Sequence, residues 1–171
     1  KIGKIMDLKF PGETEIEKLA KKGNSNKYTF PEPLAKYNDC NMSFSGLKTS
    51  VRKKYESVIN LKNNINLEIK RDICASFQKT ITNILEIKTK SAMEIFEKKF
   101  QNCEKNIAIV GGVASNNEIR FALKKICNEK KFNFFVPPPK FCTDNGVMIA
   151  YAGAEKFLSN ENNVKDLTPR A

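Results

Sequence analysis

The sequence contains no histidine among its 171 residues. Within this chain, that absence excludes a Ser-His-Asp triad, an HExxH metalloprotease helix and any zinc site with histidine ligands. No CxxC pair is present either, and the cysteines are scattered and odd in number. We therefore expect reduced thiols in a reducing compartment rather than a disulfide framework. The five cysteines are Cys40, Cys74, Cys103, Cys127 and Cys142.

Long apolar runs are missing as well. No stretch approaches the roughly 20 apolar residues that cross a bilayer. The segment Lys1–Leu8 has neither the apolar core nor the small-residue cleavage site of a signal peptide. We expect a protein without membrane segments that works in the cytoplasm, or in a mitochondrion or plastid. Because the chain starts in a segment with a helical pattern and not with Met, we also expect it to be part of a longer protein.

The charge is one-sided, with a formal net charge of +11. Such an excess favours a polyanionic partner such as nucleic acid. The abundance of lysine, asparagine and isoleucine also fits drift under AT-rich coding, so both explanations stay open. Basic residues concentrate in two places, which are Lys48, Arg52, Lys53 and Lys54, and then Arg120, Lys124, Lys125, Lys130 and Lys131.

The pattern of the first 105 residues is mainly helical. Residues 1–22 predict two helical pieces separated by Phe10-Pro11-Gly12, and Gly23 is expected to close the second piece, Thr14–Lys22. A polar loop with prolines follows from Asn24 to Asp39. A short strand is predicted at Met42–Phe44.

Two further helices are predicted after this strand. The first begins near Gly46 and places Leu47, Val51 and Tyr55 on one face. An asparagine-rich surface loop is expected at Leu61–Asn66. A long amphipathic helix then runs from Leu67 to Phe100. Its apolar face consists of Ile69, Ile73, Phe77, Ile81, Ile84, Leu85, Met93, Phe96 and Phe100.

Residues 106–160 predict the order strand, helix, strand, helix. The apolar run Ile107–Val110 indicates a buried strand, and a second strand is predicted at Phe132–Val136, where it ends at three prolines. The helix between them shows the capping-box spacing of Ser115 and Glu118. Its buried stripe is expected to be Ile119, Ala122, Leu123, Ile126 and Cys127.

The last predicted helix runs from Gly146 to Leu158, with Thr143 or Asp144 as its cap. Its apolar character suggests a place inside the fold. Residues 161–171 form a polar tail. The whole pattern indicates an α/β fold with large helical additions.

The turn after the first predicted strand of this region is the main candidate site. Gly111 and Gly112 let a ligand approach the backbone closely, and the helix behind them offers unpaired N–H groups and the positive end of its dipole. A nucleotide could lie there, and a plain turn is the alternative. Asn116 is a candidate ligand or a helix cap.

Asp144 and the serines near Gly46 are weaker candidates. A carboxylate at a helix start either binds a hard metal ion or caps the helix, and a metal needs more ligands than one aspartate. Ser43 and Ser45 lie at a corner that resembles a nucleophile turn. Because no partner base is present, we interpret them as turn or cap residues.

Six segments carry a family resemblance in their order along the chain. They read FPG and IEKLAKKG within residues 10–23, FPEPL at 30–34, SFSGLKT at 43–49, DICASFQ at 72–78, IVGGVASN at 109–116 and PPPKFCTDNGVMIAYAG at 137–153. Together they resemble the C-terminal half of the TsaD family of tRNA N6-adenosine threonylcarbamoyltransferases, of bacterial and organellar type. The resemblance covers nearly the whole chain.

The resemblance implies a fold and a reaction. The fold is the actin/Hsp70/sugar-kinase-like (ASKHA) fold, with a nucleotide between two α/β lobes, and this chain would be the C-terminal lobe. The reaction moves a threonylcarbamoyl group from threonylcarbamoyl-AMP to N6 of adenosine 37 in tRNA. The implied partners are tRNA, a TsaB-like paralogue, a TsaE-like ATPase and a YrdC-type synthase that makes the adenylate.

The resemblance also implies site residues. Asp144 would bind one divalent metal ion, iron or zinc, together with two histidines of an HxxxH motif in the other lobe. Asn116 would bind the substrate nucleotide, and Gly12, Glu13 and Glu17 would line the same pocket. The family usually has a second glycine where this chain has Glu13, and a carboxylate there would crowd or repel an adenylate.

Three other functions are alternatives. A non-catalytic RNA- or partner-binding module is favoured by the charge, and a small-molecule kinase lobe would share the fold superfamily. A peptidase is suggested only by an older glycoprotease label of the family, and the missing histidines oppose it. We assign no catalytic residue within this chain and expect the isolated chain to be inactive.

Overall fold

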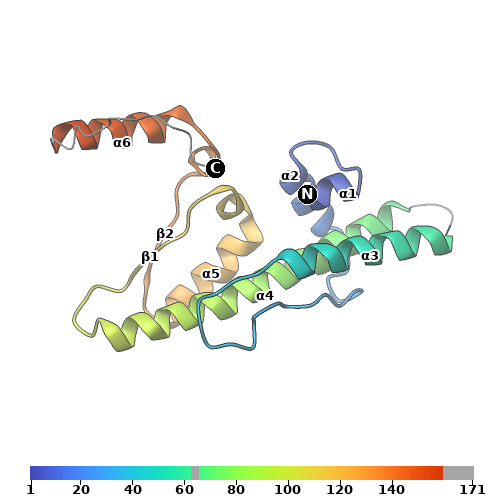
Figure 1. The fold of residues 1–171 in the computed structure, drawn as a ribbon, viewed down its shortest axis with the longest axis horizontal. Helices are drawn as coiled ribbons and strands as arrows, with labels where there is room; N and C mark the ends of the chain where they lie inside the picture. Colours follow the sequence, from blue (N-terminus) through green and yellow to red (C-terminus); the bar gives the residue numbers. More distant parts are fainter. Residues whose placement is uncertain (63–65, 160–171) are drawn as a thin grey trace.

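The computed structural model describes residues 1–62 and 66–159, and Figure 1 shows that it is mostly helical with one small parallel sheet. This confirms the predicted α/β character with a large helical part. Among the described helices, none combines the length and apolar character that crossing a bilayer requires. The elements are α1 (Ile2–Ile5), α2 (Gly12–Ala20), α3 (Ser45–Lys62), α4 (Leu67–Lys99), β1 (Asn106–Ala108), the 3-10 helix η1 (Gly112–Ser115), α5 (Asn117–Glu129), β2 (Asn133–Phe135), the 3-10 helix η2 (Pro139–Phe141) and α6 (Gly146–Leu158).

The long helix α4 is the central element of the helical part, as Figure 1 shows. Its 33 residues begin after Asn66, whose side chain accepts a hydrogen bond from the Glu68 N–H. Helices α2 and α3 pack on one part of α4, and α5 packs on another. The predicted helix from Leu67 is therefore confirmed, and so is the helix that buries Leu47, Val51 and Tyr55.

Apolar side chains gather in two clusters along α4. The first contains Met6, Val51 and Ile73, and the second contains Met93 and Leu123, with Ile81 packed against both. A fully buried side chain of this size contributes roughly 1.5–3 kcal/mol relative to an exposed one. The stripe predicted for α5 is buried as expected, and its members are Ile119, Ala122, Leu123, Ile126 and Cys127.

Polar side chains of α4 hold the loop that precedes α3. Asp72 Oδ1 accepts from the Asn24 N–H at 2.8 Å, and Ser76 Oγ accepts from the Tyr28 N–H at 3.2 Å. The Ser76 hydroxyl also donates to the Asn24 carbonyl at 3.3 Å. These bonds satisfy loop backbone groups that packing on a helix would otherwise leave without water.

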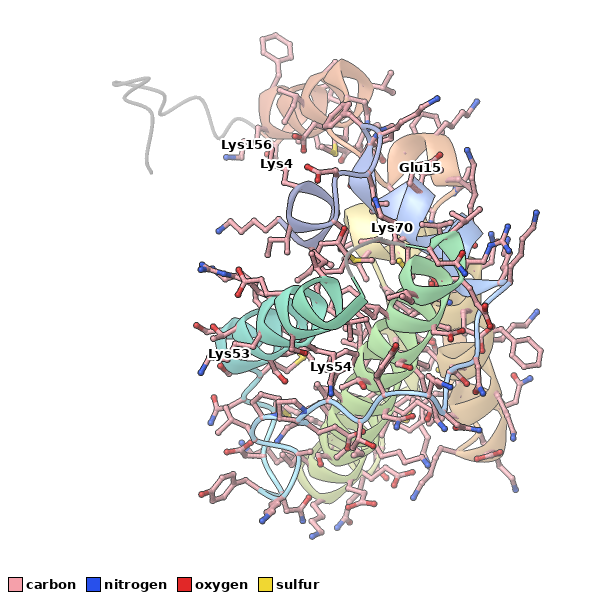
Figure 2. All side chains as sticks on the ribbon, turned by 90° about the vertical axis from the view of Figure 1, so that its right-hand side faces the viewer. Lys4, Glu15, Lys53, Lys54, Lys70 and Lys156 are labelled. Atoms are coloured by element: carbon pink, nitrogen blue, oxygen red, sulfur yellow. The ribbon has the colours of Figure 1, made fainter. Side chains whose placement is uncertain are left out.

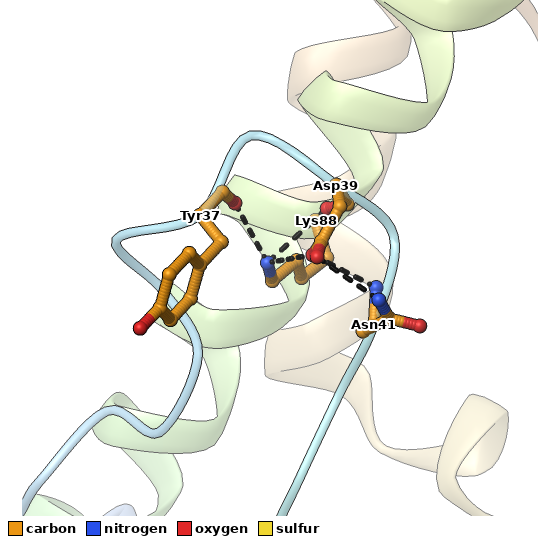
Figure 3. A network of polar contacts seen from close by, with 4 residues as sticks. All are labelled: Tyr37, Asp39, Asn41 and Lys88. Carbon is orange, nitrogen blue, oxygen red and sulfur yellow. Dashed lines mark hydrogen bonds and ion pairs between the residues drawn. The ribbon is translucent and has the colours of Figure 1, made fainter.

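Lys88 secures the far end of this loop, as Figure 3 shows. Its side chain is only 2% exposed, and its Nζ donates to the Tyr37 carbonyl at 2.9 Å. It also donates to the Asp39 carbonyl at 3.1 Å and to Asp39 Oδ1 at 2.9 Å. A buried ammonium costs free energy unless it is paired and hydrogen-bonded. Hydrogen bonds from Lys88 and Asn41 lower the pKa of the Asp39 carboxyl.

The sheet consists of β1 and β2, which are parallel, with Ile107 opposite Phe134. The α5 crossover between them covers one face, where Ile107, Ile109 and Phe134 are half-buried. On the other side, Phe135 is 54% exposed and Val110, just beyond β1, is 69% exposed. The prediction that the first strand is buried is therefore wrong for this chain, because nothing in its described part covers the second face.

Helix α6 has the predicted bounds but not the predicted place. Figure 1 shows it apart from the other helices, and its apolar residues are exposed, for example Ile149 at 69% and Tyr151 at 67%. The prediction that it lies inside the fold is wrong. The helix is apolar, as predicted, but no other described element packs over its apolar side chains.

The boundaries of three other predicted elements differ. No strand forms at Met42–Phe44, because no described strand lies beside it to pair with, and Phe44 instead accepts the first α3 hydrogen bond from the Lys48 N–H at 3.0 Å. Helix α2 ends at Ala20, before Gly23. Helix α3 extends into the predicted loop as far as Lys62; residues 63–65 of that loop and the polar tail lie outside the described residues.

Candidate functional site

The two predicted site segments follow the two strands of the sheet. The Gly111-Gly112 turn comes after β1, and the Cys142–Asn145 segment comes after β2. Because the strands are parallel, their carboxyl ends meet at the same edge of the sheet, where ligands of α/β proteins usually bind. The topology therefore directs both segments to one edge.

The Gly111-Gly112 turn is open to solvent. Gly111 has a φ of +87°, which only glycine adopts without strain, and a Cβ at Gly111 or Gly112 would meet nothing within 4 Å. Both residues are exposed. The backbone of the turn is therefore accessible to solvent, and the helix that directly follows it is the short 3-10 helix η1.

Asn116 caps α5. Its Oδ1 accepts from the Ile119 N–H at 3.1 Å, while its Nδ2 donates to Gln78 Oε1 at 2.9 Å. The predicted capping box of Ser115 and Glu118 is wrong, because η1 turns the Ser115 hydroxyl to the Gly112 carbonyl at 2.7 Å. Gln78 belongs to the DICASFQ segment, and no sequence pattern indicated its contact with Asn116.

Glu17 joins this site from α2, a hundred residues away in the chain. Its Oε1 accepts from Asn117 Nδ2 at 2.9 Å and from the Asn117 N–H at 3.4 Å, and it pairs with Lys21 at 3.2 Å. A carboxylate at the N-terminus of α5 also interacts favourably with the positive end of the helix dipole. The structure therefore brings α2 into contact with the start of α5, two regions for which the resemblance implies a common pocket.

The Glu17 contacts predict a pH-dependent stability. Burial opposes ionisation, but hydrogen bonds from Asn117 and Lys21 outweigh it and lower the pKa of the Glu17 carboxyl. Because the pKa of Glu17 is lower in the folded than in the unfolded protein, its carboxylate stabilises the fold at pH values above the unfolded-state pKa. This stabilisation is lost as the pH falls through the folded-state pKa. We expect Glu17→Gln to lower the free energy of unfolding by about 1 kcal/mol at pH 7. The difference should vanish between about pH 5 and pH 2.

Urea unfolding of both proteins across this pH range measures the effect. Glu15→Gln is the matched control on the same helix, because Glu15 pairs with Lys18 at 2.7 Å on the surface. Such a pair contributes about 0.5 kcal/mol or less. A Glu17→Gln deficit that stayed constant with pH would contradict the assignment.

Gly12 and Glu13 stand at the start of α2. A Cβ on Gly12 would lie 3.3 Å from the Gly3 Cα, so α1 and α2 meet backbone to backbone at this point. The Glu13 side chain is exposed in the first turn. Gly12 therefore has a packing role in this structure in addition to the pocket role that the resemblance implies.

Asp144 lies exposed just before α6. The predicted cap at Thr143 or Asp144 is wrong, because Asn145 caps the helix by accepting from the Met148 N–H at 3.1 Å. Over the described part of the chain, no group of three or more His, Cys, Asp or Glu side chains could hold a metal ion. A single carboxylate does not form a complete metal site, so the described residues could supply only one ligand, Asp144, to the metal that the resemblance implies.

Arg120 belongs to the second basic concentration, but its guanidinium is directed into the protein. It donates to the carbonyls of Ala114 and Pro137 and to Cys142 Sγ. In the same basic concentration, Lys130 pairs with Glu94 at 3.6 Å. The second concentration is thus partly used in internal contacts.

Four basic residues of α3 face solvent together with Lys4 of α1; they are Lys48, Arg52, Lys53 and Lys54. Figure 2 shows exposed lysines on these helices, among them Lys4 and Lys53. A shallow hollow of about 400 Å³ lies between the two helices. Its lining residues are Lys1, Lys4, Ile5, Lys48, Arg52 and Glu56. A second shallow hollow, of about 490 Å³, is lined by Arg120, Phe121, Lys124, Phe134, Phe135 and Val136, so neither hollow includes the glycine turn or Asp144.

Comparison with known proteins gives a consistent result. The family model described as TsaD, tRNA N6-adenosine threonylcarbamoyltransferase, matches residues 1–151. Curated proteins of that name are 44% identical in Rickettsia canadensis, 43% in Rickettsia rickettsii and 42% in Rickettsia bellii, each over 100% of this chain. The chain spans about half the length of these curated relatives, 49% of each.

Proposed function

This chain belongs to the TsaD family, and on that premise we propose that it is one lobe of an enzyme that transfers a threonylcarbamoyl group from threonylcarbamoyl-AMP to N6 of adenosine 37 in tRNA. The observation that carries the proposal is the family match over residues 1–151. Since the chain spans about half of its relatives, the activity is proposed for the longer protein.

The uncovered apolar surfaces support a second lobe. Parallel sheets are normally covered on both faces, but the described part of this chain places helices over one face. Helix α6 exposes further apolar side chains, including Val147 and Phe157. Surfaces of this kind mark contacts with other protein segments. We further propose that this lobe is the C-terminal lobe of an ASKHA fold. It would consist of parts 1–105 and 106–160, with a tail at 161–171.

The proposed roles of the site residues follow from their positions. The open backbone at Gly111-Gly112 is suited to receive the nucleotide, and holding the adenylate in one orientation promotes transfer by positioning. Asn116, Gly12, Glu13 and Glu17 are proposed to line the pocket, which the Glu17–Asn117 contact supports. Glu13 would place a negative charge near the adenylate.

We assign Asp144 as one ligand of a divalent ion, iron or zinc, whose other ligands lie outside this chain. The exposed position of its carboxylate supports this assignment. The proposed partners are tRNA, for which the exposed basic residues of α1 and α3 offer phosphate contacts, and the TsaB-like, TsaE-like and YrdC-type proteins. We also propose that the protein acts in the cytoplasm.

Reconstitution tests the proposal. We expect the isolated chain to form no threonylcarbamoyladenosine from threonylcarbamoyl-AMP and tRNA, because half of the enzyme is missing. Joined to its missing half and supplied with the partner proteins, it should modify tRNA, which nucleoside analysis by mass spectrometry detects. A joined, folded protein that hydrolysed ATP with a small-molecule acceptor and left tRNA unmodified would instead support the kinase alternative.

The basic surface also favours the non-catalytic alternative, an RNA-binding module. That function predicts that the isolated chain binds tRNA with an affinity that falls steeply with salt, since phosphate contacts release counterions. Tight binding by the chain, combined with no tRNA modification by the joined protein, would favour the module over the transferase.

A further inference from the structure

Arg120 connects three segments of the candidate site. It lies on α5, one turn after the cap Asn116. Its Nε donates to the Ala114 carbonyl, and its Nη2 donates to the Pro137 carbonyl at 2.9 Å and to Cys142 Sγ at 3.2 Å. One side chain therefore reaches the turn after β1 and the segment after β2.

Both ends of this connection are buried and lie close in sequence to proposed site residues. Ala114 is 1% exposed, and its N–H donates to the Gly111 carbonyl at 3.0 Å, so Ala114 closes the glycine turn. Cys142 is 4% exposed and lies two residues before Asp144. The Cys142 Sγ is also within 3.6 Å of the Pro137 carbonyl.

The chemistry of the guanidinium suits this arrangement. It is always charged and presents five donors in a rigid planar fork, so it can bond acceptors in two directions at once. A lysine ammonium is a single point of charge on a flexible stem and cannot hold both directions with the same geometry.

We propose that Arg120 is a positioning residue that fixes the Gly111-Gly112 turn relative to the Cys142–Asp144 segment. The functional part of this inference rests on the proposed function, because that function makes the turn a nucleotide contact and Asp144 a metal ligand. The geometric part rests only on the contacts of Arg120.

Hydrogen exchange in the joined, full-length protein tests the geometric part. We expect Arg120→Gln and Arg120→Lys to speed exchange about tenfold in peptides covering 110–117 and 140–146, because hydrogen bonds from a charged donor are lost. Peptides from the middle of α4 should keep their rates. The control is Lys124→Gln, one turn further along α5 and exposed, which should change neither segment.

Kinetics of the same variants test the functional part. Both Arg120 variants should lower kcat/KM for threonylcarbamoyl-AMP about tenfold while leaving KM for tRNA unchanged. Unchanged exchange in either segment, or equally fast exchange throughout α5, would overturn the inference. If the wild-type protein transfers nothing, the proposed function fails while the exchange result still decides the role of Arg120.

Discussion

Replacing Gly23 by alanine is expected to lower the free energy of unfolding by about 3 kcal/mol, at the upper end of what overpacking costs. A Cβ on Gly23 would lie 2.1 Å from the Arg71 carbonyl oxygen and 2.8 Å from the Asp72 nitrogen. Both are backbone atoms of α4, so neither can rotate away. The chain after α2 would have to lift from α4 and would weaken the Asn24–Asp72 hydrogen bond.

Urea unfolding measures this loss, which corresponds to a fall in Tm of roughly 10 °C for a chain of this size. The matched control is Gly153→Ala, because a Cβ on that glycine in α6 would meet nothing within 4 Å. Alanine is the better helix former by about 1 kcal/mol, so the control should not destabilise the protein. If the two variants were equally stable, this result would contradict the close approach of Gly23 to the α4 backbone.

Replacing Asp144 by alanine is expected to reduce tRNA modification by the joined protein about 100-fold or more. The reason is that a proposed metal ligand is lost, and disturbing even the outer shell of a metal site costs 10- to 100-fold in affinity or activity. The metal content per protein, measured by atomic absorption, should fall in parallel. The exposed carboxylate has no structural contact in the described residues, so the folded state should survive.

Asn145→Ala separates this effect from damage to α6. It removes the cap on the Met148 N–H, which costs about 1 kcal/mol, but keeps the carboxylate. We expect this variant to keep its metal and most of its activity. Undiminished tRNA modification by Asp144→Ala would remove Asp144 from the metal site.

Elements with a strong local pattern could be predicted from the sequence. The helices α3, α4 and α5 and both strands lie where apolar spacing placed them, and α6 has its predicted bounds. A helix depends on hydrogen bonds and side-chain contacts within four residues, so its pattern is readable locally. The prediction of a short strand at Met42–Phe44 was wrong because a strand needs a second strand to pair with, and a local pattern does not show whether one is present.

Helix caps were harder, because several polar residues compete at each helix start. Ser115 and Asp144 fitted the rules for capping residues as well as Asn116 and Asn145 did. The choice depended on neighbouring turns: η1 uses the Ser115 hydroxyl, and Asp144 stands one residue too early. Around the candidate site, the family resemblance pointed to Glu17 and Asn116, whereas nothing in the sequence indicated the contacts of Gln78, Asn117 and Arg120.

The family, the helical framework and the glycine turn are readable from the sequence alone, since motifs and short-range periodicity do not depend on coordinates. The contacts of Glu17 with Asn117, of Asn116 with Gln78 and of Arg120 with the segments after both strands appear only in the folded chain. The folded chain also shows that no described element covers α6 or the second face of the sheet. Contacts between residues 38 or 100 positions apart depend on how the chain packs around α4, and that packing leaves no trace in local sequence.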